Sequence, residues 1–169
     1  MSKAMIIWAI AAMWNGSQAQ EMVAKYDEYL LMQNLPQWAQ STIQTTEFSS
    51  KYRISLQLNP FFYEEDFDGD KQRDLALFIE AKKSGMKGIL ILNGKKKSMT
   101  VLGAGIGFAN AGDNFDWINV WRPDRKFKLL PNSKPPVPAG VSLWVERFES
   151  GSGVIYWNGT EFHWFQEGD

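Results

Sequence analysis

Two Asn-Gly pairs, at residues 93–94 and 158–159, constrain the fold of this chain more than any other feature. Both residues of such a pair tolerate the positive φ that a tight hairpin turn requires. The strand-like segments that flank them are residues 88–92 and 98–102 for the first pair, and 154–157 and 161–166 for the second. The chain therefore predicts two β-hairpins, and the first hairpin extends an antiparallel meander from residues 75–79.

Other segments complete the expected fold. Apolar and polar side chains alternate along residues 53–58 and 141–148, and this alternation predicts half-buried strands. Residues 118–121 are assigned to a further short element, which Pro123 and Asp124 end. Residues 21–32 instead repeat apolar side chains at helical spacing, and Pro36 follows as a helix stop. We therefore expect an α+β fold, with an N-terminal helix packed on a mostly antiparallel, meandering sheet of about seven strands.

The N-terminus has the three parts of a secretory signal. Lys3 is a short basic start, residues 4–14 are an apolar core, and small residues precede a cut after Ala19. The core is too short to span a bilayer, which needs about 20 apolar residues. The alternative is a buried N-terminal helix. The pattern favours a signal peptide at residues 1–19, a single domain at residues 20–169, and a secreted or periplasmic protein with no stable membrane anchor after cleavage.

Charge and cysteine content exclude some classes of protein. The chain has 18 basic and 19 acidic side chains. This balance argues against a nucleic-acid partner, which usually requires a clustered positive face. The basic run at residues 95–97 follows an Asn-Gly pair and is most simply a solvated hairpin end. There are no cysteines, so disulfides cannot hold the fold together. Residues 130–140 contain four prolines and predict an extended surface loop.

The acidic stretch at residues 66–74 carries the most specific chemistry. Ca²⁺ takes six to eight oxygen ligands, and a looped acidic segment can supply them. Carboxylates this close together would repel one another strongly without a cation. A solvated acidic turn without metal is the alternative, because Asp and Gly form turns readily. The predicted calcium ligands are Asp66, Asp68, Asp70, the carbonyl of Gln72, and Asp74.

This stretch, DFDGDKQRDL, resembles the calcium loops of FG-GAP and VCBS-type repeats, whose pattern is close to D-x-[DN]-G-D-G-x-x-D-[LI]. It matches every acidic position, as well as Gly69 and Leu75, and departs from the pattern at Lys71, where the family usually has glycine. The resemblance implies a structural calcium loop. The family's repeats stack into propellers, which one copy in a chain of this size cannot form. An EF-hand is excluded because position 12 is Leu77 instead of glutamate.

More of the chain is similar to small secreted bacterial proteins that carry a single loop of this kind. This broader resemblance implies an extracytoplasmic location and a bound ion, but no activity. The matching segments are residues 35–38 (LPQW), 88–91 (GILI), 103–105 (GAG), 112–117 (GDNFDW) and 152–159 (SGVIYWNG), with Phe162, Trp164 and the final Gly-Asp pair.

Two other functions fit the residue types. Trp144, Trp157 and Trp164 could line a glycan- or peptide-binding face on the C-terminal hairpin, although aromatic residues in strands usually pack in a core. Asp113, Asp116 and His163 could form a hydrolase site, provided that the fold brings them together.

The hydrolase is the weaker of the two alternatives, because the chain has neither a serine elbow nor a cysteine nucleophile. The glycine-rich residues 103–112 lack the last glycine of a dinucleotide loop and are better explained as structural turns. The favoured interpretation is a non-catalytic extracytoplasmic domain with one calcium loop.

Overall fold

The computed structural model describes residues 26–125 and 137–168. The chain divides into two compact units, Met1–Leu35 and Pro36–Asp169, and each is described by itself. In the first unit, residues 26–34 are helical, which confirms the later part of the helix predicted at residues 21–32. The predicted signal peptide at residues 1–19 and residues 130–136 of the predicted proline-rich loop lie outside the described residues.

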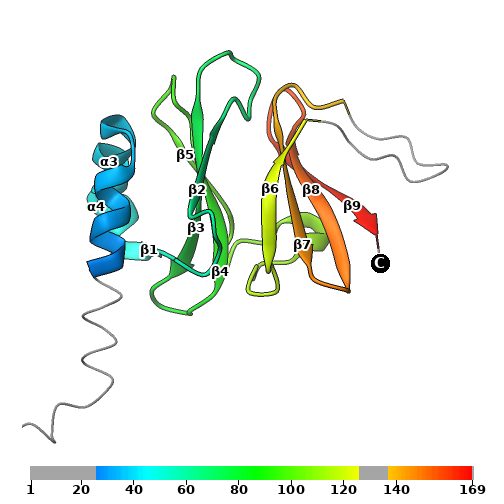
Figure 1. Cartoon of the computed structure of the whole chain (residues 1–169), viewed down its shortest axis with the longest axis horizontal. Helices are drawn as coiled ribbons and strands as arrows, with labels where there is room; N and C mark the ends of the chain where they lie inside the picture. The colour runs from blue at the N-terminus through cyan, green and yellow to red at the C-terminus, as the bar shows by residue number, and fades with distance from the viewer. Residues whose placement is uncertain (1–25, 126–136, 169) are drawn as a thin grey trace, which may run out of the picture. The chain divides into compact units, whose positions relative to one another are not determined.

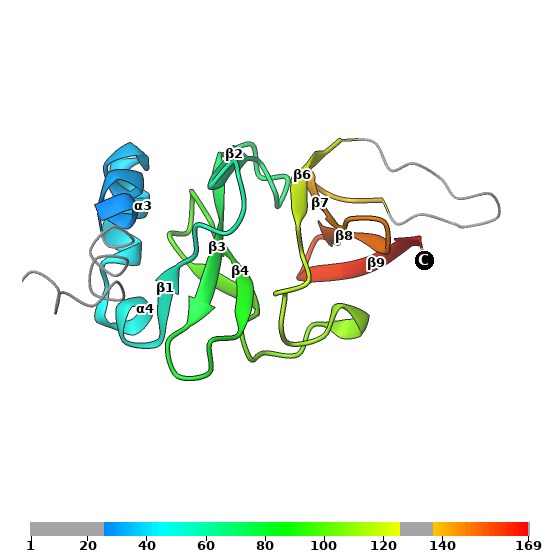
Figure 2. The same ribbon diagram turned by 60° about the horizontal axis from the view of Figure 1, so that its bottom comes forward.

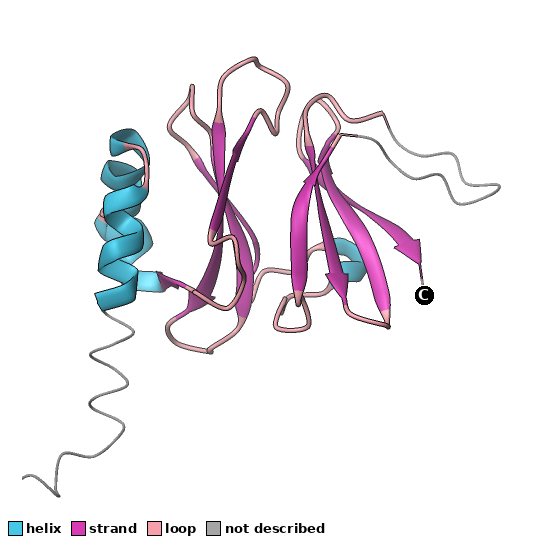
Figure 3. Cartoon of the chain, in the orientation of Figure 1, coloured by secondary structure: helices cyan, strands magenta, loops and turns pink. Residues whose placement is uncertain are grey.

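The second unit contains two antiparallel β-sheets (Figures 1 and 3). The first sheet has five strands in the order β1-β3-β4-β5, with β2 also paired to β3, and the second has four in the order β6-β7-β8-β9. The strands are β1 (Tyr52–Ile54), β2 (Phe62–Glu65), β3 (Asp74–Ala81), β4 (Lys87–Leu92), β5 (Met99–Gly103), β6 (Val120–Asp124), β7 (Ser142–Arg147), β8 (Gly151–Trp157) and β9 (Phe162–Gly168).

The prediction of an α+β fold with one sheet of about seven strands on a helix is therefore wrong. The described residues form nine strands in two sheets, with few and short helices, so the architecture is mostly β. The meander stops because the chain leaves β5 and runs through residues 104–119, which include the short 3-10 helix η1 (Ala109–Ala111). The strands after this connection pair with one another. Alternation predicts where a strand lies, but not which edge it joins.

Both predicted hairpins are confirmed. β4 pairs with β5 in a register that places Leu90 opposite Val101. β8 pairs with β9 in a register that places Ile155 opposite Trp164. The strand predicted at residues 53–58 is confirmed only at its start: β1 covers Tyr52–Ile54, and residues 55–58 lie in no strand. The strand β2 was not predicted, and it pairs with the same edge of β3 as β1 does.

The strand β3 is central to the first sheet and is buried on both faces. Ala76 and Phe78 belong to a core shared with residues of the second sheet, including Leu143 and Ile155. Leu77 is also fully buried but points to the opposite face, since side chains alternate along a strand. The helices α3 (Gln37–Ile43) and α4 (Thr46–Lys51) lie on the side of the first sheet that faces away from the second (Figure 2).

The two short helices were not predicted from the sequence. α3 follows directly after Pro36, and α4 begins after Thr45, whose Oγ1 accepts a hydrogen bond from the peptide N–H of Phe48. Within the part of the chain that the structure describes, no helix is both long and apolar enough to cross a membrane.

Candidate metal site

The acidic loop connects β2 to β3 and brings three carboxylates together. Asp66, Asp68 and Asp74 each offer an oxygen, and these oxygens lie within 4.8 Å of one another. The antiparallel pairing of β2 with β3 sets Glu65 opposite Asp74, so the two ends of the loop start from neighbouring positions. This cluster could hold a metal ion.

Peptide N–H groups of the loop hold the first carboxylate in place. Asp66 Oδ1 accepts a hydrogen bond from the N–H of Gly69 at 2.7 Å, and Asp66 Oδ2 accepts one from the N–H of Lys71 at 2.9 Å. An Asp side chain that bonds to the backbone a few residues ahead stabilises a turn. The fold of the loop thus depends on the same oxygens that would contact an ion.

Asp74 is the buried member of the cluster, with 1% of its surface exposed. Its Oδ2 accepts hydrogen bonds from the N–H groups of Phe67 at 3.0 Å and Asp68 at 3.3 Å. Its Oδ1 accepts one from the N–H of Gly94, in the first hairpin loop, at 2.9 Å. Through these hydrogen bonds, Asp74 links the acidic loop to the β4–β5 hairpin.

The surroundings of Asp74 disfavour its negative charge. Burial raises the pKa of Asp74 to about 6, the hydrogen bond from Gly94 works against this rise, and the charge of Asp68 adds to it. None of the ion pairs among the described residues reaches Asp66, Asp68 or Asp74. A cation placed between these carboxylates would supply the missing opposite charge.

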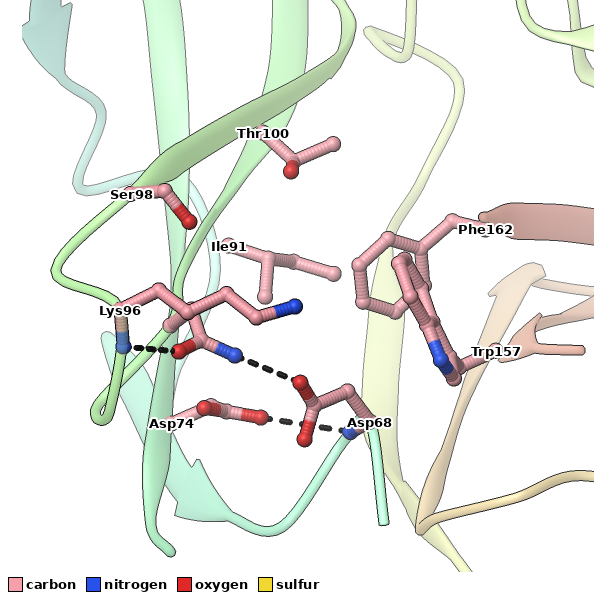
Figure 4. A pocket seen from close by; sticks show the side chains of 9 residues that line it. Asp68, Asp74, Ile91, Lys96, Ser98, Thr100, Trp157 and Phe162 are labelled. Carbon is pink, nitrogen blue, oxygen red and sulfur yellow. Dashed lines mark hydrogen bonds between the residues drawn. The ribbon is translucent and has the colours of Figure 1, made fainter. Parts of the chain in front are cut away.

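Asp68 and Asp74 both line a small cavity (Figure 4). Asp68 Oδ2 accepts a hydrogen bond from Asn93 Nδ2 at 2.6 Å, and Asp68 Oδ1 accepts one from the N–H of Asp70 at 3.1 Å. The cavity has a volume of about 40 Å³ and is bounded on its far side by Trp157 and Phe162. That volume has room for a few water molecules.

The other two predicted ligands stand apart from the three-carboxylate cluster. Asp70 is not one of its members, although its Oδ2 is buried without a hydrogen-bond partner among the described residues and lies 3.8 Å from Lys95 Nζ. Gln72 is exposed, and its peptide N–H donates to Asp70 Oδ1 at 2.8 Å. No described contact brings the Gln72 carbonyl to the cluster.

The backbone of the loop explains both glycine positions of the calcium-loop pattern. Gly69 has a φ of 79° and Lys71 a φ of 69°, so both lie in the left-handed region. A non-glycine residue there is strained because its Cβ crowds the backbone. A Cβ on Gly69 would also lie 2.1 Å from the carbonyl oxygen of Ala139. Lys71 thus retains a conformation that glycine would adopt more easily.

The three tryptophans of the predicted binding face do not share one face of the second sheet. Trp157 pairs with Phe162, and Trp164 pairs with Ile155 of the shared core. Trp144 pairs with Val154, the neighbour of Ile155, so it points to the opposite side.

The surroundings of Trp144 and Trp164 differ accordingly. The indole N–H of Trp144 donates to Glu167 at 2.8 Å, and the guanidinium of Arg122 lies 4.4 Å from its ring centroid. Trp164 packs edge-on against Trp117, with a distance of 6.1 Å between the ring centroids.

The predicted hydrolase residues are not joined either. His163 Nε2 lies 2.7 Å from Asn158 Nδ2 and 3.3 Å from Glu161 Oε1. Asp116 lines a different cavity, together with Trp117 and other residues, and Asp113 is exposed. Among the described residues, no hydrogen bond or ion pair connects any two of Asp113, Asp116 and His163.

Two sets of residues around the carboxylate cluster were not identified from the sequence. Asn93 and Gly94 were assigned only to a hairpin turn, but they also contact Asp68 and Asp74. Residues 139–141 pass against the loop, where the N–H of Val141 donates to the carbonyl oxygen of Asp66 at 2.7 Å. These contacts are tertiary, and no local pattern in the sequence signals them.

Comparisons of the chain with protein-family models, with curated proteins and with solved structures find no match.

Proposed function

We propose that the loop at residues 66–74 binds a divalent cation, with Ca²⁺ preferred, and that the ion stabilises the fold without taking part in catalysis. One observation carries the proposal: Asp66, Asp68 and Asp74 hold oxygens within 4.8 Å of one another, while no described ion pair reaches any of them. Three carboxylates in this arrangement repel one another unless a cation lies between them.

The donor set favours calcium among the common ions. The three side chains offer only carboxylate oxygens, which suit hard cations such as Ca²⁺ and Mg²⁺ better than zinc or copper. Each carboxylate has about four lone-pair sites. Asp66 and Asp68 each accept two hydrogen bonds and Asp74 accepts three, so each carboxylate keeps at least one site for an ion. Ca²⁺ tolerates irregular geometry, whereas Mg²⁺ demands a nearly ideal octahedron.

The likeness to FG-GAP and VCBS-type loops supports the same ion. Lys71 occupies the position where those loops usually have glycine, and its φ is positive. A strained residue and an added positive charge at this position are expected to weaken the site. A weak site is useful outside the cytoplasm, where calcium-binding modules work with dissociation constants of about 0.1–1 mM.

The proposal therefore includes a secreted or periplasmic location, with residues 1–19 as a cleaved signal peptide. Its support is the sequence pattern of a basic start, an apolar core and small residues before Ala19.

The test is a thermal melt of the full chain with calcium chloride and then with excess chelator. A ligand at 100 times its dissociation constant stabilises a protein by about 2.7 kcal/mol. For a chain of this length, the melting temperature should rise by about 5–10 °C. The rise should be smaller with magnesium and should disappear in Asp68→Asn.

Asp113→Asn is the matched control, because it neutralises an exposed aspartate outside the loop and should keep the full calcium response. The proposal fails if calcium leaves the melting temperature of the wild type unchanged, or if Asp68→Asn responds as strongly as the wild type.

The glycan-binding alternative at the C-terminal hairpin lacks comparable support. Trp144 faces away from Trp157 and Trp164, and the cavity beside Trp157 has a volume of only about 40 Å³. A sugar ring needs several times that space.

A further inference from the structure

A second cavity lies away from the acidic loop, at the end of the connection between the two sheets. Its volume is about 430 Å³, and it is open to solvent, since four of its five lining residues are exposed. The residues that line it are Asn114, Asp116, Trp117, Asn119 and Arg147.

The two asparagines of this cavity use their amide oxygens to hold the backbone. Asn114 Oδ1 accepts hydrogen bonds from the N–H groups of Lys87 at 2.8 Å and Asp116 at 3.2 Å. Asn119 Oδ1 accepts one from the N–H of Phe148 at 3.2 Å. These bonds fix the orientation of both side chains. Both Nδ2 groups remain as donors that no described hydrogen bond uses.

The cavity also has one unpaired charge of each sign. The side chains of Asp116 and Arg147 are exposed, and no described ion pair or side-chain hydrogen bond engages either of them. Together with the two amides, they offer an acceptor and several donors around one space, with no net charge.

The indole ring of Trp117 lines the cavity and is held in place by its contacts. Its indole N–H donates to the carbonyl oxygen of Ala111 at 3.3 Å. Its ring packs edge-on against Phe115 and Trp164, with centroid distances of 6.3 and 6.1 Å. The side chain is only partly buried, so part of the ring is accessible from the cavity.

We propose that this cavity binds a neutral saccharide. Sugar hydroxyls both donate and accept hydrogen bonds, so they can pair with the Asp116 carboxylate and also with the amide and guanidinium donors. The apolar C–H face of a sugar ring packs on an indole such as that of Trp117. The opposite charges of Asp116 and Arg147 favour a ligand without net charge.

A zwitterionic peptide is the competing occupant, with its ammonium group at Asp116 and its carboxylate at Arg147. The saccharide is favoured because ion pairs between exposed groups contribute little in water. The saccharide site does not depend on the metal proposal, since none of its residues belongs to the acidic loop.

The experiment is an NMR titration of the full chain, following the indole N–H signal of Trp117. The probes are cellotetraose, chitotetraose, maltotetraose and mannotetraose at millimolar concentration, with glycylglycine as the zwitterionic probe. At least one of the four saccharides should shift this signal saturably, and glycylglycine should not.

Asp116→Ala should weaken the saccharide at least tenfold, because a hydrogen bond to a charged group is lost. Asp113→Ala, in the same segment but outside the cavity, should bind as tightly as the wild type, and the spectra of both variants report whether they are folded. The proposal is overturned if all four saccharides leave the signal unmoved, if the two variants weaken binding equally, or if glycylglycine shifts the signal instead.

Discussion

The segments at residues 66–74 and 103–119 both combine glycine and aspartate, yet they satisfy their own peptide groups in different ways. In the first, the carboxylates of Asp66 and Asp74 accept the N–H groups of the turn. In the second, the amide oxygen of Asn114 does so, and Asp116 is left exposed. In the first segment, the carboxylates that hold the turn are therefore also the ones that would contact an ion, whereas in the second the Asp116 carboxylate takes no part in holding its turn.

The largest loss of stability should come from removing the buried carboxylate of Asp74. Asp74→Ala leaves the peptide N–H groups of Phe67, Asp68 and Gly94 without their acceptor. An unsatisfied buried donor costs about 1–3 kcal/mol, so the free energy of unfolding should fall by about 3 kcal/mol or more. Urea denaturation with chelator present measures this change.

The same experiment on Asp116→Ala completes the comparison. Because that carboxylate is exposed and has no described partner, its loss should change the free energy of unfolding by about 0.5 kcal/mol or less. If Asp74→Ala and Asp116→Ala lowered the free energy of unfolding equally, the peptide hydrogen bonds to Asp74 would not stabilise the fold.

A second, smaller contrast concerns glycine. A Cβ on Gly94 would lie 1.9 Å from the carbonyl oxygen of Arg73, so Gly94→Ala forces the hairpin away from the acidic loop. Overpacking of this kind typically costs about 1–3 kcal/mol. A Cβ on Gly107 would meet no atom within 4 Å. Gly107→Ala should therefore unfold at the same urea concentration as the wild type, while Gly94→Ala unfolds at a lower one.

The third and smallest contrast concerns a carboxylate that is held by side chains instead of peptide groups. Burial alone would raise the pKa of Glu80, but the hydrogen bonds and charges of Lys87 and Arg53 outweigh burial and keep it below its usual value of 4.5. The resulting stabilisation is therefore present above about pH 4.5 and is lost as the pH falls through the lowered pKa.

Glu80→Gln should reduce the loss of stability between neutral pH and pH 3 by up to about 1 kcal/mol, as measured by urea denaturation at each pH. High salt should produce a similar reduction in the wild type, because it screens the two ion pairs. An unchanged pH profile in the variant would assign the acid sensitivity to other groups.

Local pattern predicted much of this molecule. The alternation and the Asn-Gly pairs located β4, β5, β8 and β9, because hairpins depend on neighbouring residues. The division into two sheets was not predicted, since pairing between distant strand edges leaves no mark in a local window. The short β2 was missed for the same reason, because it is defined by its pairing with β3.

Local sequence also predicted only part of the candidate site. The spacing of Asp66, Asp68 and Asp74 was read from nine consecutive residues, and the fold brings these three together. The contacts from Asn93 and Gly94 come from a hairpin further along the chain. The cavity around Trp117 was also missed, because Arg147 joins the four lining residues at 114–119 only after β7 pairs with β6.

The contact between Val141 and the acidic loop affects when this loop can fold. The N–H of Val141 bonds to the carbonyl oxygen of Asp66, and a Cβ on Gly140 would lie 2.5 Å from that same oxygen. These residues are far apart in the chain, and long-range contacts form slowly because a large loop must close first. We expect the acidic loop to reach its final shape only after the C-terminal half has been synthesised and has docked. A nascent or truncated chain would then carry the whole acidic motif without its final shape.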